Sequence, residues 1–428
     1  MHRTVRGSLR VRRPWWVLLT GLIAAAAWAW VKAHERNAAP DATLAGLVSQ
    51  VQAHPKDFKA WNRIVDWQLR RYGTTGTLEA LHEARRAARC SLEAEGDLDR
   101  NLGGLVMRTR VELAFHRCQA ARADAERLIA RLPNQALSFQ LLGDALFQQG
   151  KLPETETAWQ KAQELGEARQ TSLWHTAQLD LARGHTADAL ARLAAAVAAA
   201  QADRASSPEG IAWYRVQWGE AAFRSGDWPA AEQQYAAALS AAPQSYAALE
   251  HRAELRGAQG KVEEAAEQYR ALIARTSRPE LMQALGDLYV FNQQPDQAAP
   301  WYDQALAAYL AATRAGDETL YSHHLAGFYS DARLDAEQAV AWAERDLRER
   351  PGSPPAHDAL AWALCKAGRL DEALRECDAA LTNGTRDAHI LYHAGIIHMC
   401  VNDADGGAAF LRRAAEANPC FNKFHVHR

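Results

Sequence analysis

The sequence is poor in residues that interrupt helices: its 428 residues include only 26 glycines and 15 prolines, and runs of β-branched residues are few. A fold built mainly from β-strands would use more of these β-branched residues. Alanine, which has the highest helix propensity, is instead very abundant. The composition therefore predicts an all-α protein.

An excess of one charge is also missing, because 49 lysine and arginine residues nearly balance 51 aspartate and glutamate residues. Without a basic surplus we expect no nucleic-acid partner. The motifs G-x-x-x-x-G-K-[ST], H-E-x-x-H, G-x-S-x-G and G-x-G-x-x-G are all absent. The six cysteines form no C-x-x-C pair, which removes the signature of thioredoxin-like and zinc-ribbon proteins. We therefore expect neither an enzyme nor a bound cofactor.

The N-terminus combines a basic flank with an uncharged stretch. Residues 1–13 contain five arginines and no acidic residue, and residues 14–31, PWWVLLTGLIAAAAWAWV, carry no charge. At 1.5 Å per residue such a helix is about 27 Å long, close to the thickness of a bilayer core. Tryptophans at both ends are typical of a span that stays in the membrane. We expect a basic cytoplasmic tail at 1–13, a transmembrane signal anchor at 14–32 and a linker at 33–45.

Two alternatives stay open for this segment. Ala27, Trp28 and Ala29 form a passable signal-peptidase site, so the segment also fits a cleaved signal peptide. In both cases the basic flank stays inside and the remainder is exported, and the anchored form is a single-pass protein of the cell inner membrane with a periplasmic C-terminal part. An inverted anchor would instead keep that part in the cytoplasm.

One sequence motif recurs along the rest of the chain, and each copy predicts a helix, a polar or glycine-containing turn and a second helix. Copies begin at Leu142 (LGDALFQQGKLPETETAWQKA), Trp218 (WGEAAFRSGDWPAAEQQYAAALSAAP), Leu285 (LGDLYVFNQQPDQAAPWYDQAL) and Leu360 (LAWALCKAGRLDEALRECDAAL). The motif resembles the tetratricopeptide repeat, in which W-x2-L-G-x2-Y is followed by A-x3-F and by a proline. The resemblance implies a right-handed superhelical solenoid of helix-turn-helix units that binds a protein or peptide partner in its concave groove.

The small residue of the Leu-Gly pair, which we call the anchor, sets the register of the repeat. The anchors are Thr109, Gly143, Ala177, Gly219, Ala253, Gly286, Ala326, Ala361 and Gly395, mostly 33 to 35 residues apart. A bulky or apolar residue usually follows 16 positions later, and Pro133, Pro243 and Pro419, each 24 positions after an anchor, are expected to stop second helices. The unit at Ala326 needs one extra residue to stay in phase. Counting a degenerate unit around Trp61, we predict about ten units: degenerate ones at 46–133, a regular array at 134–420 and a tail at 421–428.

A second stripe on the first helix of each unit is expected, by the same resemblance, to line the partner-binding groove. With neighbouring residues it comprises Trp174, His175, Trp213, Gln217, Glu220, His251, Glu254, Asp287, His324, Asp358, Trp362 and His393. The middle of the stripe is acidic with histidines and its end is apolar, so we expect a partner segment with basic and apolar side chains. The alternative is that these residues are merely solvated.

The histidines also suggest a second function, that of a metal- or small-molecule-handling protein. One histidine per unit cannot converge on one ion, because packed helices lie about 8–10 Å apart. His389 and His393 are the exception, since a spacing of four residues puts both on one face of a helix. This pair needs further ligands, which Cys420, His425 or His427 would supply if the tail folded back. No disulfide is expected between Cys365 and Cys400, although both lie on or near the stripe.

Overall fold

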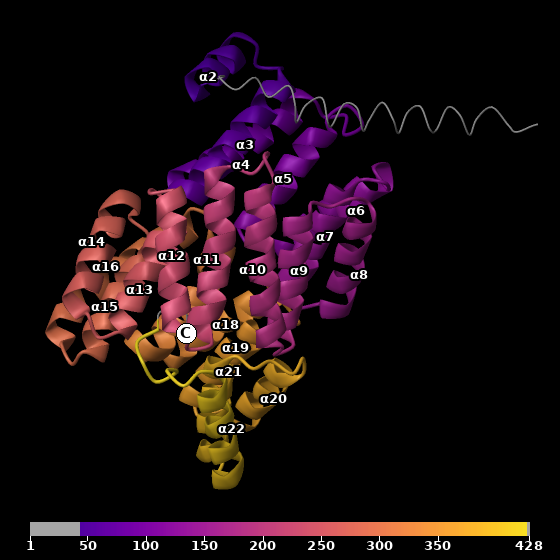
Figure 1. Ribbon diagram of the computed structural model, residues 1–428. Coiled ribbons are helices and arrows are strands. Elements are labelled where there is room, and N and C mark those ends of the chain that lie inside the picture. The colour runs from indigo at the N-terminus through magenta and orange to yellow at the C-terminus, as the bar shows by residue number, and fades with distance from the viewer. Residues whose placement is uncertain (1–42, 426–428) are drawn as a thin grey trace, which may run out of the picture.

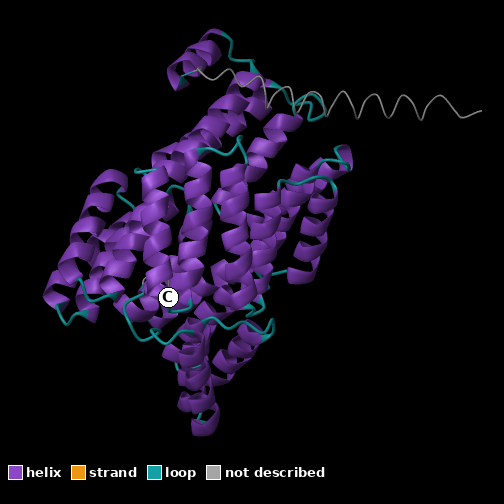
Figure 2. Ribbon diagram, viewed as in Figure 1, coloured by secondary structure: helices purple, strands orange, loops and turns teal. Residues whose placement is uncertain are grey.

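The computed structural model describes residues 43–425, and this part of the chain contains 21 α-helices, one short π-helix and no strand (Figure 2). In chain order they are α2 (Leu44–Ala53), α3 (Phe58–Thr75), α4 (Leu78–Ala94), α5 (Leu102–Ala114), α6 (Cys118–Arg131), α7 (Ala136–Gln148), α8 (Leu152–Glu164), α9 (Arg169–Ala182), α10 (Thr186–Ala202), α11 (Pro208–Arg224), α12 (Trp228–Ala241), α13 (Tyr246–Ala258), α14 (Val262–Thr276), α15 (Pro279–Phe291), α16 (Pro295–Arg314), α17 (Glu318–Gly327), η1 (Phe328–Ala332), α18 (Ala336–Glu349), α19 (Pro354–Lys366), α20 (Leu370–Leu381), α21 (Ala388–Cys400) and α22 (Ala404–Ala417). The all-α prediction is confirmed for these residues.

The predicted basic tail, the transmembrane segment at 14–32 and most of the linker lie outside the described residues. Within residues 43–425, no helix is both long and apolar enough to cross a membrane.

From α3 onward the helices form ten consecutive pairs, α3 with α4 through α21 with α22, as expected for an array of about ten units. The anchors at Gly143 and Gly219 show how the two helices of a pair meet. A Cβ atom on Gly143 would lie 2.2 Å from the ring of Trp159, and one on Gly219 would lie 2.4 Å from the ring of Tyr235. Each bulky residue, 16 positions after its anchor, thus occupies the space that the missing side chain leaves. The bulky residue that the sequence places 16 positions after the anchor is thus the one that packs against it in these two units.

Departures from a regular spacing have local structural causes. The unit at Ala326, which needs one extra residue, contains the π-helix η1 directly after α17. A π-helical turn holds one more residue than an α-helical turn, so the extra residue is accommodated and the following helix keeps the register of the repeat. The long spacing before Ala326 is taken up by α16, which has 20 residues against the 14 of α12.

The second half of the array packs against the first along a line of contacts that we call the closure seam. Three hydrogen bonds define it: Arg278 Nη1 to the Tyr72 hydroxyl (3.4 Å), Thr319 Oγ1 to the Phe115 carbonyl (2.6 Å) and the Gly352 amide to the Gln149 carbonyl (2.9 Å). Partners across the seam are about half the described chain apart in sequence. Figure 1 shows the result, with the C-terminal pair α21 and α22 directly below α11. The array is therefore a solenoid whose two halves touch.

Candidate functional site

A cavity of about 730 Å³ lies where the two halves of the array face each other. Its walls come from α7, α9 and α11 of the first half and from α19, α21 and the segment after α22. Eight aromatic side chains line it: Phe147, Phe223, Trp228, Phe291, Trp362, Tyr392, Phe421 and Phe424. Phe291 and Tyr392 remain 42% and 37% exposed, although residues of this kind are usually packed away from water. Both the size and the presence of several aromatic side chains are typical of binding pockets, which have volumes of about 300–1,000 Å³.

The charged residues of the lining do not make the cavity acidic. Three acids and three arginines line it: Glu220, Asp331, Asp387, Arg224, Arg350 and Arg386. Other acids of the predicted stripe are used in packing between helices. Asp287 accepts a hydrogen bond of 2.7 Å from the Tyr302 hydroxyl, and Glu254 is 1% exposed. The expectation of an acidic groove therefore does not hold for this cavity.

Of the twelve predicted groove residues, four line the cavity: Gln217, Glu220, Trp362 and His393. The histidines of the stripe share another role, because each stacks on an aromatic ring of an earlier helix. The pairs are His175 on Trp159 (4.1 Å between ring centroids), His251 on Tyr235 (5.8 Å), His324 on Tyr309 (6.3 Å) and His393 on Trp362 (4.1 Å). The recurring histidine is thus mainly a packing element between helices.

Two predicted groove residues form an aromatic patch beside the cavity. The rings of Trp174 and Trp213 lie 5.0 Å apart, and Trp174 Nε1 donates a hydrogen bond of 3.1 Å to Gln217 Oε1. Since Gln217 lines the cavity and Trp213 is 41% exposed, the patch continues the aromatic surface outward from the cavity.

The segment after α22 folds back onto the array, as the metal hypothesis required. Its His425 pairs with Glu254, a residue outside the predicted metal pair. His425 Nδ1 lies 2.5 Å from Glu254 Oε1, and Phe424 is buried against Gly257, where a Cβ atom would lie 2.4 Å from its ring. The tail therefore forms one wall of the cavity. No sequence pattern points to this contact, because it joins units that are distant in the chain. His427 lies outside the described residues.

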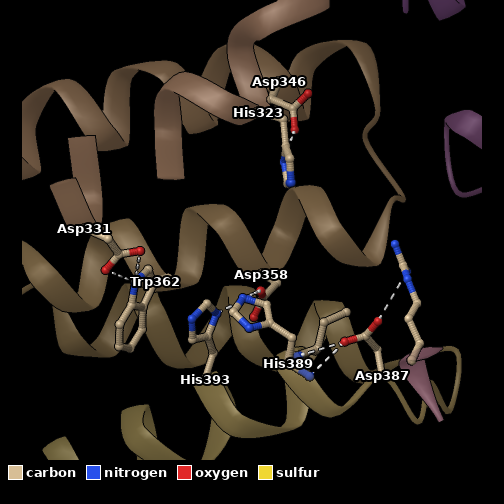
Figure 3. Close-up of polar contacts among 10 residues, drawn as sticks. His323, Asp331, Asp346, Asp358, Trp362, Asp387, His389 and His393 are labelled. Atoms are coloured by element: carbon tan, nitrogen blue, oxygen red, sulfur yellow. Dashed lines mark hydrogen bonds and ion pairs between the residues drawn. The ribbon is translucent and has the colours of Figure 1, made fainter. Parts of the chain in front are cut away.

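A carboxylate joins the predicted pair His389 and His393. Asp358 of α19 has its Oδ2 atom 2.9 Å from His393 Nδ1 and 3.9 Å from His389 Nε2 (Figure 3). Burial raises the pKa of Asp358 to about 7. Burial, together with repulsion from His393, lowers the pKa of His389 to about 3, so its imidazole is neutral at physiological pH. Two imidazoles on the cavity wall, with a buried carboxylate beside them, are groups that bind metal ions and that also form hydrogen bonds with ligands.

Comparison with known proteins identifies the repeat. Residues 106–168 and 216–279 match a family model described as tetratricopeptide repeat. These two segments are tetratricopeptide repeats. They contain the anchors Thr109, Gly143, Gly219 and Ala253, in agreement with the register read from the sequence.

No curated protein sequence is significantly similar to the chain. Solved structures similar to it include the Rap conjugation gene regulator of the plasmid pLS20 in complex with the Phr* peptide, which is 11% identical, with 85% of this chain and 98% of that chain covered and a TM-score of 0.46. The human IFIT1 dimer with PPP-AAAA is 12% identical, with 91% and 88% covered and a TM-score of 0.46. A tetratricopeptide repeat protein from Parabacteroides merdae ATCC 43184 is 19% identical, with 58% and 93% covered and a TM-score of 0.32. None of these likenesses bears on function.

His251, in a tetratricopeptide repeat unit, makes stability depend on pH. Burial alone would lower its pKa, but the carboxylates of Glu254 and Glu220 raise the pKa of His251 from 6.5 to about 9. The protonated ring is therefore favoured in the folded state. Its stabilising contribution is complete below the unfolded-state pKa and is lost as the pH rises through the folded-state value.

We expect the denaturation midpoint in urea to fall as the pH rises from about 6 to about 10, and the substitution His251→Gln to reduce this fall. The exposed His185 provides the control, since His185→Gln should leave the pH dependence as it is in the wild type. A pH dependence that is identical in His251→Gln and in the wild type would contradict the assignment.

The thiols of Cys365 and Cys400 lie closer together than the repeat spacing suggested. Cys365 lies in α19 and Cys400 in α21, the first helices of successive helical pairs. Burial and a hydrogen bond with the neighbouring Cys400 thiol raise the pKa of Cys365 to about 11. Both thiols are free in the structure, although their side chains are neighbours.

Proposed function

We propose that the protein is an interaction scaffold, which binds a segment of a protein or peptide partner in the cavity between the two halves of its array. The exposed rings of Phe291 and Tyr392 in the cavity wall carry this proposal, because a bound partner would remove them from water. Tetratricopeptide repeat arrays generally serve as protein-binding scaffolds, which supports the same conclusion. The proposal includes no catalytic role.

The side chains that line the cavity indicate which kind of partner segment would fit it. Aromatic walls favour large apolar side chains. The three arginines and three acids of the lining favour a segment that carries charges of both signs, instead of the basic segment that the sequence suggested.

We further propose that residues 14–32 anchor the scaffold in the inner membrane, with the array on the periplasmic side. The tryptophans at both ends of the uncharged stretch support a membrane span, and the arginine-rich flank supports this orientation. Fusions of alkaline phosphatase and of a fluorescent protein to the C-terminus test it. Phosphatase activity supports a periplasmic array, whereas fluorescence alone would contradict it.

Alanine substitutions in the cavity wall test the binding site. Peptides that bind the wild-type protein are first selected from a displayed library of random linear sequences. Phe291→Ala and Tyr392→Ala are each expected to weaken their binding about tenfold or more, because aromatic residues at the centre of an interface commonly contribute about 2 kcal/mol and tenfold corresponds to about 1.4 kcal/mol. Fluorescence anisotropy with a labelled peptide measures the change.

Leu137 provides a matched control, because it is 41% exposed and does not line the cavity. Leu137→Ala is expected to leave binding unchanged. Selected peptides that bind both cavity variants as well as they bind the wild type would exclude the cavity as the binding site.

A further inference from the structure

Asp358, His389 and His393 form the one group within residues 43–425 in which three metal-ligating side chains converge. A donor atom of each lies within 4.8 Å of a donor atom of the other two. Around a tetrahedral zinc ion, with bonds of about 2.0–2.1 Å, neighbouring ligand atoms lie about 3.4 Å apart. The observed separations of 2.9 Å and 3.9 Å from Asp358 Oδ2 fall on either side of that value. Small side-chain rotations would therefore bring all three donors to one ion.

The chain places these donors through its repeat. His389 and His393 lie one helical turn apart on α21, and Asp358 lies 35 residues before His393, one unit earlier on α19. Asp387 fixes the start of α21, since its carboxylate accepts a hydrogen bond of 2.9 Å from the His389 amide. Two adjacent units thus contribute ligands to the same point.

Neighbouring side chains hold the ring of His393 in position. Its imidazole stacks on the indole of Trp362 at an interplanar angle of 9°, and that indole donates from Nε1 to Asp331 Oδ1 at 3.1 Å (Figure 3). In metal sites generally, residues that do not touch the ion hold the ligating imidazoles in their orientation.

Within residues 43–425, no short polar contact explains why a histidine stands at position 389. Among the described residues, the polar contact of its imidazole is the long one of 3.9 Å to Asp358, and its ring packs edge-on against His393 at 3.9 Å. His389 and His393 both line the cavity, so the remaining coordination positions of an ion would open onto it.

Two other histidines, His175 of α9 and His323 of α17, lack this arrangement. His175 lies 3.3 Å from Asp144 and 3.0 Å from Glu167, without a second imidazole at ligand distance in the described part of the chain. His323 shares Asp346 with the guanidinium of Arg350, which occupies the place of a cation.

We propose that Asp358, His389 and His393 bind one divalent transition-metal ion on the wall of the cavity. Two imidazoles and one carboxylate suit zinc, cobalt and iron(II), and they leave positions for water or for a group of a bound partner. The ion would lie against the aromatic wall formed by Trp362, so its open positions would face whatever occupies the cavity.

Titration of the chelator-treated protein with Zn²⁺ tests this proposal, with a chromophoric chelator as the competitor. We expect one equivalent to bind, and His389→Gln to weaken this binding at least tenfold. His398→Gln is the matched control, because His398 lies on the same helix and pairs with Asp403 outside the cavity. It should bind Zn²⁺ as the wild type does. Within residues 43–425, His389→Gln removes no side-chain hydrogen bond. Asp358→Asn is a second variant expected to weaken binding similarly.

The spectrum of bound Co²⁺ distinguishes this site from the thiols of Cys365 and Cys400. Nitrogen and oxygen ligands give weak visible bands without the strong near-ultraviolet band of a cobalt–thiolate bond. A thiolate band, the absence of stoichiometric binding, or equal affinity in His389→Gln and wild type would each overturn the proposal.

Discussion

Replacing Arg278 with alanine is expected to destabilise the protein by about 3–5 kcal/mol, because removal of one partner leaves a buried carboxylate without its counter-ion. The side chain of Arg278 is 13% exposed, and that of its ion-pair partner Glu280 is 7% exposed. The guanidinium also lies 5.0 Å from the centre of the Tyr246 ring and reaches Tyr72 across the closure seam. Chemical denaturation followed by tryptophan fluorescence measures the loss.

The exposed Arg275 at the end of α14 provides the control for this substitution. Arg275→Ala removes the same charge three residues away and is expected to change stability by no more than about 0.5 kcal/mol. If both variants lost the same free energy of unfolding, the buried ion pair of Arg278 and Glu280 would not stabilise the fold as we expect.

The substitution Gly150→Ala is expected to lower the free energy of unfolding by about 2–4 kcal/mol more than Gly166→Ala does. Both glycines have positive φ angles, 73° and 88°, so the left-handed backbone costs each alanine about 1–2 kcal/mol. Only Gly150 is at the seam, where a Cβ atom would lie 1.9 Å from the Gly352 carbonyl oxygen. The added cost comes from overpacking, about 1–3 kcal/mol, and from loss of the Gly352 hydrogen bond, about 1 kcal/mol.

The comparison separates the seam from backbone strain, because a Cβ atom on Gly166 would meet no atom within 4 Å. Thermal or chemical denaturation of the two variants gives the difference directly. Equal destabilisation would mean that the two halves of the array do not press together at Gly150. A Gly150→Ala protein that remains folded should also bind the selected peptides less well, since the cavity lies between these halves.

The sequence predicts the units because each unit is specified locally. Gly143 and Trp159 belong to one helical pair, so their contact follows from a fixed spacing of 16 residues. The extra residue at Ala326 is also a local signal, and it appears as the π-helix η1.

Closure of the array could not be predicted in this way. It depends on small rotations that accumulate over many units, and nothing in the sequence around Gly150 indicates that Gly352 lies against it. The cavity follows from closure, which is why Arg224, Arg386 and the tail residue Phe421 were not predicted as lining residues.

The candidate site was predicted only in part, because the stripe was read as an open surface. His175 and His251 lie on the predicted face, but packing between helices buries both. His389 and His393 were paired correctly by their spacing on one helix. Asp358 was placed on the stripe but not beside them, since its approach depends on how α19 packs against α21.

Photo-cross-linking from inside the cavity tests the central claim most directly. A photoreactive amino acid replaces Gln178, which lines the cavity, and in a second variant it replaces Lys161, which is exposed on α8 outside it. Each protein is irradiated with a peptide selected for binding, and the products are mapped by mass spectrometry. We predict that the peptide joins position 178 and not position 161, and that Phe291→Ala suppresses the product. Cross-linking at position 161 with none at position 178 would contradict binding in the cavity.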